Sequence, residues 1–463
     1  MDATQHSSKP VVFIGAADAI CGRAIESFVA ASTLPIVLAD ADESAIRRNT
    51  TKLSPNRATI KQTNIYEPSE LRSLISGARL VVQGAQPYGR ASGPVLGACL
   101  DAKVPYLDYS DDVKSTQDSL DLFERAEQQG VPCYINCGSS PGLTNLMAVD
   151  AAKELESVDT IDVAWYVTDR GGQNGKEVLE HLMHITAGPC MTWADGKPAV
   201  HENWVETSYA PMIPGEGDVL LHETIHPEPV TLPRAFPTAK RVRCLGALNP
   251  LPFNGFSRGL AVAVREGALP MEVAIEFLWN LATRPTTAVD GAASDSSSWL
   301  EVVKAQLRGG DIKLRELYQL ACHAAGALDP WRHAIWGMIR QVQDGECSLV
   351  DAARFMVNSA RGRHPDYRAG ILVRVLGTRN GVPTVVYRRQ ATTIQDPEES
   401  MAVNIGSSCA AFLLMVTETE LDPEGLKRAG VFCPEDWAEL DTYYKAMERL
   451  GRRQKDNIES FRS

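Results

Sequence analysis

The segment 168–189 carries the densest group of side chains that could transfer protons. On a helix, Lys176, Glu180 and His184 lie one turn apart on one face, while His181 lies on another. Such groups can act as general acids or bases. His184 and Lys176 are therefore candidate catalytic residues, and His181 is a candidate substrate ligand. An amphipathic helix with ordinary ion pairs on its solvent face would show the same pattern.

A turn near the N-terminus has the outline of a dinucleotide-binding site. An apolar run reaches Gly15, and the small residues Ala16 and Ala17 follow it. Backbone N–H groups at the start of a helix attract a diphosphate, and small side chains let the backbone approach it. Ile20 stands where the last glycine of the usual motif would be, and the next glycine comes two residues late. These four residues are candidate cofactor ligands, and an ordinary strand–turn–helix connection is the alternative.

Asp40 ends the second apolar run, about 25 residues after Gly15. A carboxylate at this point can accept hydrogen bonds from an adenosine ribose. The next residue is Ala41 rather than the arginine that commonly accommodates a 2′-phosphate, although Arg47 and Arg48 follow within two helical turns. The pattern slightly favours NAD over NADP. A solvated loop carboxylate is the alternative.

Polar and small residues also follow the ends of three later apolar runs. In a parallel sheet these ends meet at one rim, where ligands bind. The candidates are Ala85, Gln86, Pro87, Ser110 and Gly142 for the cofactor, Tyr88, Asp108 and Asn136 for the substrate, and Ser140 for catalysis. Loop packing is the alternative for each of them.

The elements that must position these residues alternate along the first third of the chain. Strands are predicted near 11–15, 35–39, 59–63, 80–84, 106–108 and 132–136, with helices near 23–32, 44–53, 68–75, 92–102 and 120–129. This alternation is typical of a doubly wound parallel sheet of the Rossmann type. Ligands gather at the carboxyl ends of the strands in such a sheet.

The pattern changes after about residue 150. A longer strand over 161–169 and hairpins at Asp195-Gly196 and Asn380-Gly381 predict a mixed sheet, with helices over 270–356. Helices are predicted again over 403–416 and 434–450. The fold class is α/β: a Rossmann domain over 1–146, a mixed α/β substrate and dimerisation domain over 147–400, and C-terminal helices over 401–463 that pack back on the first domain.

Composition limits the classes of partner. The 463 residues carry 46 basic and 58 acidic side chains, a net charge of −12, which disfavours binding to nucleic acid. Ten scattered cysteines predict buried free thiols and a reducing compartment. The polar N-terminus lacks the apolar region of a signal peptide, and no apolar run approaches the ~20 residues of a membrane span. We expect a cytoplasmic protein that acts on a small molecule.

A pair of histidines in "LLHETIHPEPVTLPR" is a possible metal site. His222 and His226 are four residues apart, as in a helical metal pair. Pro227, Pro229 and Pro233 predict an extended segment instead, where positions four apart lie ~13 Å from each other. The sequence therefore predicts no metal site here.

Three segments together resemble the saccharopine dehydrogenase (saccharopine reductase) family. They are "VVQGAQPYGRASGPVLGACLDAKVPYLDYSDD", "GVPCYINCGSSPGLTNLMAVDAA" and "HPEPVTLPRAFPTAKRV". They supply the turn at residues 85–88, the strand end at 106–108 and the turn at 138–145. The resemblance implies a Rossmann domain, a mixed α/β domain and a site in the cleft between them. It also places Arg234 in the substrate domain, where it could pair with a substrate carboxylate or form a structural salt bridge.

The family's chemistry implies an NAD(P)-dependent oxidoreductase that reduces an imine or oxidises a secondary amine of an amino-acid or polyamine-like substrate. Ser140 departs from the family, which often has an aspartate at this turn, and a serine cannot do a carboxylate's acid–base work. Two alternatives stay open: a trans-acting enoyl reductase, and a non-catalytic nucleotide-binding or sensing protein. A homodimer is an option, since the apolar "AIEFLWNLA" could be core or dimer face.

Overall fold

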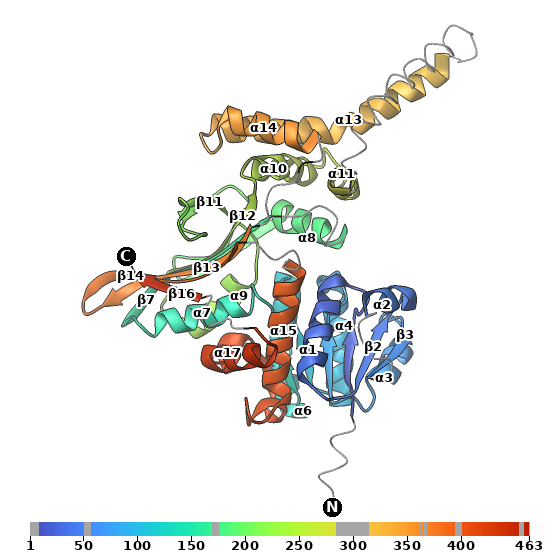
Figure 1. Ribbon diagram of the computed structural model, residues 1–463, viewed down its shortest axis with the longest axis vertical. Coiled ribbons are helices and arrows are strands. Elements are labelled where there is room, and N and C mark those ends of the chain that lie inside the picture. The colour runs from blue at the N-terminus through green and yellow to red at the C-terminus, as the bar shows by residue number, and fades with distance from the viewer. Residues whose placement is uncertain are drawn as a thin grey trace, which may run out of the picture.

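The computed structural model describes residues 9–50, 57–168, 176–283, 314–360, 363, 368–393, 401–452 and 458–462. Two sheets form the body of the molecule, and the long helix α15 stands between the N-terminal domain and the second sheet (Figure 1). The predicted α/β class is confirmed, because the first sheet is parallel and the second is mixed.

The N-terminal sheet has the order β15-β6-β5-β4-β1-β2-β3. Its strands are β1 (Val11–Ile14), β2 (Ile36–Asp40), β3 (Ala58–Gln62), β4 (Leu80–Gln83), β5 (Tyr106–Asp108), β6 (Pro132–Tyr134) and β15 (Gly430–Phe432). All of their pairings are parallel. Strand β1 is buried along its whole length, as expected for the centre of a sheet covered on both faces. The winding reverses between β1 and β4, which creates a crevice at the carboxyl ends of these strands.

Helices cover both faces of this sheet. They are α1 (Ala19–Ala31), α2 (Glu43–Asn49), α3 (Pro68–Ile75), α4 (Tyr88–Ala102), α5 (Val113–Leu120) and α6 (Phe123–Gln129). The next helix, α7 (Leu143–Ala152), packs on the second sheet instead. Local signals set several ends. Asp18 and Asp112 cap α1 and α5 with their carboxylates, and Pro68 occupies the first turn of α3. Gly130 ends α6 in the left-handed conformation.

The second sheet has the order β10-β11-β12-β7-β13-β14-β16, with the β8–β9 hairpin attached to β12. Its strands are β7 (Ser157–Thr168), β8 (Pro189–Ala194), β9 (Lys197–Glu202), β10 (Thr207–Ala210), β11 (Val219–Glu223), β12 (Arg241–Asn249), β13 (Arg368–Arg379), β14 (Val382–Thr393) and β16 (Ile458–Arg462). Both predicted hairpin turns are present, with positive φ at Asp195, Gly196, Asn380 and Gly381.

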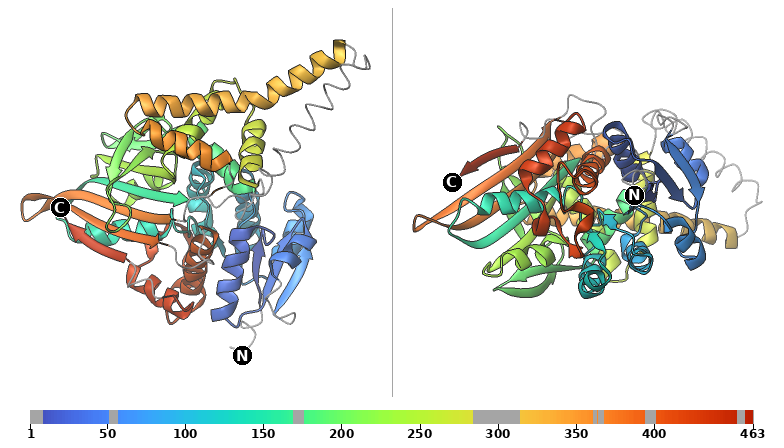
Figure 2. Two further views of the ribbon diagram at one scale, coloured as in Figure 1. Left: turned by 45° about the horizontal axis from the view of Figure 1, so that its top comes forward. Right: turned by 90° about the horizontal axis from the view of Figure 1, so that it is seen from below.

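Helices α8 (Lys176–Ala187), α9 (Glu228–Ala235), α10 (Pro252–Arg265), α11 (Met271–Thr283), α13 (Leu314–Gln343) and α14 (Leu349–Ala360) accompany the second sheet. Helix α13 extends away from both sheets (Figure 2). Helix α9 corrects the extended segment predicted after His226, because Pro229 lies in the first turn, where proline is tolerated. In the part of the chain that the structure covers, no helix is both long and apolar enough to cross a bilayer.

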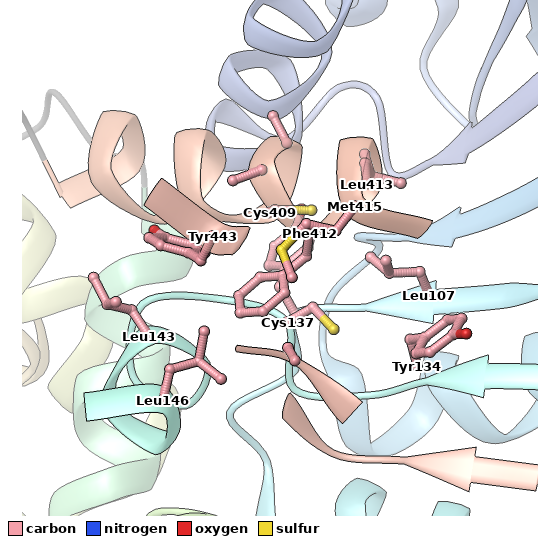
Figure 3. Packing of buried hydrophobic residues seen from close by; sticks show 14 of the residues in the cluster. Leu107, Tyr134, Cys137, Leu143, Leu146, Cys409, Phe412, Leu413, Met415 and Tyr443 are labelled. Atoms are coloured by element: carbon pink, nitrogen blue, oxygen red, sulfur yellow. The ribbon is translucent and has the colours of Figure 1, made fainter. Parts of the chain in front are cut away.

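The C-terminal segment joins the two domains. It contains α15 (Met401–Thr417), the short 3₁₀ helix η2 (Gly425–Lys427), α16 (Pro434–Trp437) and α17 (Leu440–Arg449), together with β15, which the helical prediction for this segment did not contain. Cys409, Phe412 and Leu413 of α15 belong to the same buried cluster as Leu143 and Leu146 of α7 (Figure 3). One buried cluster thus runs from the first sheet through α15 to the second, so that residues of both domains are held in register.

Glu435 of α16 is buried where this segment meets α7 and α9. Asn145 Nδ2 donates to Glu435 Oε2 at 2.8 Å and to Thr231 Oγ1 at 3.1 Å. Burial, with a smaller contribution from Asp436, raises the pKa of Glu435 from 4.5 to about 7. The carboxyl group therefore holds its proton more tightly in the folded chain than in the unfolded chain.

This raised pKa predicts a loss of stability with rising pH. The contribution of Glu435 is fully present below about pH 4.5 and is lost as the pH rises through about 7. We expect Glu435→Gln, which stays neutral, to gain about 3 kcal/mol in free energy of unfolding relative to the native protein between pH 4.5 and 8. Urea unfolding of both proteins across this range measures the difference. Parallel pH profiles for the two would contradict a raised pKa at Glu435.

Candidate functional site

A cavity of about 180 Å³ opens at the carboxyl ends of the N-terminal strands. Ile20 and Tyr88 line it from the first turns of α1 and α4. Gln86, Tyr109 and residues 138–140 line it from the loops after β4, β5 and β6. The opposite wall comes from β7, α8, β13, β14 and α15. The cavity thus lies where the winding of the first sheet reverses and where the second domain covers it, the usual position of a ligand in such folds.

A hydrogen-bonded histidine and glutamate stand at the wall of this cavity. His226 lines it, and its Nδ1 donates to Glu228 Oε2 at 2.8 Å. The other oxygen, Glu228 Oε1, accepts from Ser140 Oγ at 2.6 Å and from Thr144 Oγ1 at 3.0 Å. Because a carboxylate only accepts, Nδ1 carries a proton, and Nε2 is the ring nitrogen left to exchange a proton with a ligand.

The electrostatics of the pair favour a charged imidazolium. Burial lowers the pKa of His226, but the charge of Glu228 and its hydrogen bond outweigh burial, so the pKa lies above 6.5. Burial raises the pKa of Glu228, but His226 and the hydrogen bond from Ser140 outweigh it, so that pKa lies below 4.5. His226 can therefore hold a proton near neutral pH and release it to a ligand.

Two tight turns bring this pair to the first domain. The turn over residues 138–142 closes with Gly138 N bonded to Pro141 O, and it projects Ser140 toward the second domain. Its last residue, Gly142, has φ +130, and a Cβ there would overlap the carbonyl of Gly138. On the other side, Pro227 caps α9, so His226 precedes the helix and Glu228 begins it.

The turn between β1 and α1 has the shape that a dinucleotide requires. Gly15 has φ +84, and a Cβ there would overlap the backbone of Gly84 and Ala85. Asp40 ends β2, as a ribose ligand should, and its Oδ2 accepts from Ala17 N at 3.2 Å. Strand order, glycine and carboxylate all fit a nicotinamide dinucleotide.

Asp18 occupies the N–H groups that the diphosphate would need. Its Oδ1 accepts from Ile20 N at 2.8 Å and from Cys21 N at 3.0 Å, and Gln86 Nε2 lies 3.5 Å from its Oδ2. A bound diphosphate must therefore displace this carboxylate or share the turn with it. Arg47 and Arg48 are paired with Glu43 and Asp42.

The structure brings only some of the predicted site residues to the cavity. Ile20, Gln86, Tyr88 and Ser140 line it. Gly15, Ala16, Ala17 and Asp40 form the cofactor turn, Ala85 and Pro87 flank Gln86, and Gly142 ends the turn that carries Ser140.

Three further predicted residues form a buried network behind the strand ends. Asp108 Oδ1 accepts from Asn136 N at 2.9 Å and from Ser110 N at 3.1 Å, and Asn136 Nδ2 donates to Ser110 O at 2.7 Å. Burial raises the pKa of Asp108 to about 6. These contacts hold the loops after β5 and β6 in place, and none of the three residues lines the cavity.

The helix expected to carry Lys176, Glu180 and His184 is present as α8, but its face toward the cavity is apolar. Leu179, Leu182 and Ile185 line the cavity, whereas the His184 side chain is 56% exposed and lies 3.9 Å from Glu180. The side chains of Lys176 and His181 fall outside the described residues. Arg234 is also away from the cavity, where its Nη1 lies 3.4 Å from Asp436 Oδ2.

The sequence interpretation missed His226, Glu228 and Asp18. The sequence offers His226 only as a possible metal ligand. The two hydroxyl donors to Glu228, Ser140 and Thr144, lie more than 80 residues away in the chain. Asp18 could have been found from the sequence, because an aspartate just before a helix commonly caps its first N–H groups, and Asp18 lies two positions before Ile20.

Two groups of three side chains among the described residues have potential metal-ligand atoms within 4.8 Å of one another. The first group is His226, Glu228 and Cys244, and the second is His201, Glu206 and Glu223. Hydrogen bonds within the chain already account for the buried carboxylate of each group. Glu228 accepts as described above, and Glu223 accepts from Thr192 Oγ1 at 2.8 Å and pairs with His201 Nδ1 at 2.7 Å. We assign no metal to either group.

Comparison with known proteins agrees with this architecture. Residues 11–133 match the family described as the saccharopine dehydrogenase NADP binding domain. Apo saccharopine dehydrogenase (L-Glu forming) from Saccharomyces cerevisiae superposes over 98% of this chain and 99% of that chain, with 14% identity and a TM-score of 0.58. A structure of GenD2 from gentamicin A biosynthesis in complex with NAD aligns over 52% of this chain and 66% of that chain, with 14% identity and a TM-score of 0.28.

No curated protein matches the sequence. The family match and the full-length superposition confirm the predicted resemblance and the predicted fold. Residues 11–133 thus match a saccharopine dehydrogenase NADP binding domain, and the chain as a whole shares the fold of the yeast saccharopine dehydrogenase.

Proposed function

We propose that this protein is an NAD(P)-dependent oxidoreductase that acts on a C–N bond of an amino-acid or polyamine-like substrate, by imine reduction or secondary-amine oxidation. The observation that carries the proposal is the His226–Glu228 pair, which stands in a cavity at the reversal point of the Rossmann sheet. A proton donor and a dinucleotide turn that meet at one cavity are what such chemistry needs.

The proposed reduction adds a hydride to the imine carbon and a proton to the nitrogen, so that the C=N double bond becomes a single bond. A bound reduced nicotinamide supplies the hydride. His226 Nε2 supplies the proton, and Glu228 stabilises the imidazolium before transfer and orients the ring. Ser140 donates a hydrogen bond that holds Glu228, so it takes a positioning role instead of the acid–base role of the aspartate common in the family.

Enoyl reduction is a second candidate, because the far wall of the cavity is mostly apolar and would also suit an acyl chain.

The buried free thiols, nine among the described residues, support a reducing compartment, and we propose a cytoplasmic location. Asp40 with Ala41 after it supports NAD over NADP.

Titration of the purified protein with NADH and NADPH, followed by nicotinamide fluorescence, tests the proposal. We expect micromolar binding, with NADH the tighter of the two. Asp18→Asn should tighten binding roughly fivefold, because it removes a negative charge beside the diphosphate while an asparagine still caps α1.

Asp112→Asn is the matched control, since Asp112 caps α5 through Ser115 N and does not line the cavity. Its affinity should stay within twofold of the native value. No binding of either nucleotide would sink the oxidoreductase proposal and favour a purely structural Rossmann turn. An unchanged affinity in Asp18→Asn would mean that the diphosphate binds away from the start of α1.

A further inference from the structure

The side chain of Asn145 joins three separate segments of the chain. It is fully buried, and its Oδ1 accepts from Gly142 N at 2.9 Å. Its Nδ2 donates to Thr231 Oγ1 at 3.1 Å and to Glu435 Oε2 at 2.8 Å. Because a backbone N–H can only donate, Oδ1 must face Gly142, and both Nδ2 protons are then taken up by the other two partners. Hydrogen bonds to the turn over 138–142, to α9 and to α16 thus hold the carboxamide in one orientation.

Two of these contacts act on the segments that meet at Glu228. Gly142 ends the turn that carries Ser140, and Ser140 Oγ donates to Glu228 Oε1 at 2.6 Å. Thr231 lies one helical turn after Glu228 on α9. The same two segments are therefore joined twice, by the Glu228 carboxylate and by the Asn145 carboxamide. The second link fixes the distance between α9 and the turn, because separating them would leave buried polar groups unpaired.

The third contact adds the C-terminal segment, through Glu435 of α16. A further contact between α9 and α16 joins Arg234 Nη1 to Asp436 Oδ2 at 3.4 Å, but the Arg234 side chain is 39% exposed and water screens the pair. Loss of the Asn145 carboxamide would instead leave partners unpaired away from water, which is far more costly than loss of a screened pair. Asn145 is therefore the stronger link between these helices.

We propose that Asn145 is a positioning residue for the proton donor. Its carboxamide holds α9 and α16 against the turn over 138–142, which keeps Glu228 hydrogen-bonded to His226. The inference rests on the role proposed above for His226 and adds a requirement to it. The C-terminal segment, through α16, takes part in keeping His226 charged and aimed at the cavity.

The variant Asn145→Ala removes the three hydrogen bonds without adding a charge. With α9 held less firmly, the attraction of Glu228 for His226 should weaken while the ring stays buried, so the pKa of His226 should fall. NMR titration of the full-length protein, labelled with 13C at the histidine rings, measures this change, and the signal missing from His226→Gln identifies His226. We also expect kcat for imine reduction to fall about tenfold, with NADH affinity unchanged.

Gln341→Ala is the matched control for the loss of a buried carboxamide. Gln341 is also fully buried, its Oε1 accepts from Gly255 N at 3.1 Å, and its Nε2 donates to Leu251 O at 3.0 Å. These contacts tie α13 to the start of α10, and none of the three residues lines the cavity. The control should lose stability in urea, as Asn145→Ala does, but keep the native His226 titration.

An exchange of the two side chains tests the contact with α16. In Asn145→Asp the donor is lost and a carboxylate faces Glu435, so kcat should fall as it does in Asn145→Ala. Adding Glu435→Gln returns an amide donor to the pair, now from α16, and should restore kcat to within about threefold of the native value. The double variant also tests the inference if Asn145→Ala does not fold.

The outcomes separate this inference from the proposed function. A destabilised Asn145→Ala with the native kcat and the native His226 titration would overturn the inference. So would an equal change of the titration in Gln341→Ala, or a double variant no faster than Asn145→Asp alone. If the native protein reduces no imine, the C–N proposal fails, and a lowered pKa of His226 in Asn145→Ala would still support the positioning role.

Discussion

Replacing His226 by glutamine should lower the turnover number for imine reduction by two to four orders of magnitude, roughly the usual contribution of a general acid. The glutamine amide can still donate to Glu228, so the wall of the cavity is kept. It cannot release a proton at neutral pH, and the nitrogen must then be protonated by water. Steady-state rates of NADH oxidation with a cyclic imine measure the loss.

The control for this variant is His184→Gln. His184 was the histidine that the sequence favoured for catalysis, but its side chain is largely exposed and does not line the cavity. We expect its rate to stay within twofold of the native rate, and NADH affinity to be unchanged in both variants. Equal losses in the two variants, or a loss only in His184→Gln, would remove His226 from the mechanism.

The pH dependence of the reaction tests the role of Glu228. Reduction needs the charged imidazolium, so the rate should fall as the pH rises through the pKa of His226, which lies above 6.5. In Glu228→Gln the burial of His226 remains but the attraction of the carboxylate is gone. The fall in rate should therefore move to lower pH, whereas a structural role for Glu228 would lower the rate equally at every pH.

Gly142→Ala should reduce the free energy of unfolding by about 3 kcal/mol or more. The φ of +130 is one that residues with a Cβ rarely adopt, and the added methyl group would overlap the Gly138 carbonyl. The turn carries Ser140, so its distortion should also weaken the hold on Glu228. Guanidinium chloride unfolding gives the change in stability.

Gly130→Ala is the control that separates the cost of a positive φ from the cost of steric overlap. Gly130 also has a positive φ, +69, but no atom lies within 4 Å of the place where its Cβ would be. This variant should therefore lose only about 1 kcal/mol. A similar loss in the two variants would show that crowding at the turn over 138–142 contributes nothing.

Much of the fold could be predicted because its signals are local. The buried run of β1, the proline at the start of α3 and the glycine at the end of α6 each act within a few residues. Gly15 and Asp40 were predictable for the same reason, since the end of a parallel strand fixes which residues face the crevice. Strand β15 was missed because it is defined by its pairing with β6, which lies far away in the chain.

The pairing of His226 with Glu228 and Ser140 could not be predicted in this way. Pro227 and Pro229 suggested an extended segment, yet they lie at the start of α9 and leave His226 just ahead of the helix. Conversely, the residues around His184 do form a helix, but packing places its leucines on the cavity and its histidine in solvent. Periodicity predicts a helix and its faces, but not which face a distant sheet will cover.

By itself, then, the sequence determined the alternating elements, the dinucleotide turn and the likeness to saccharopine dehydrogenase, because these depend on neighbours in the chain. The tertiary structure decided which groups meet. Glu228 acquires its environment from Ser140 and Thr144, more than 80 residues away, and the cavity acquires its mostly apolar far wall from strands and helices of the second domain. Burial and partners set the pKa of a side chain, and both arise only when the chain folds.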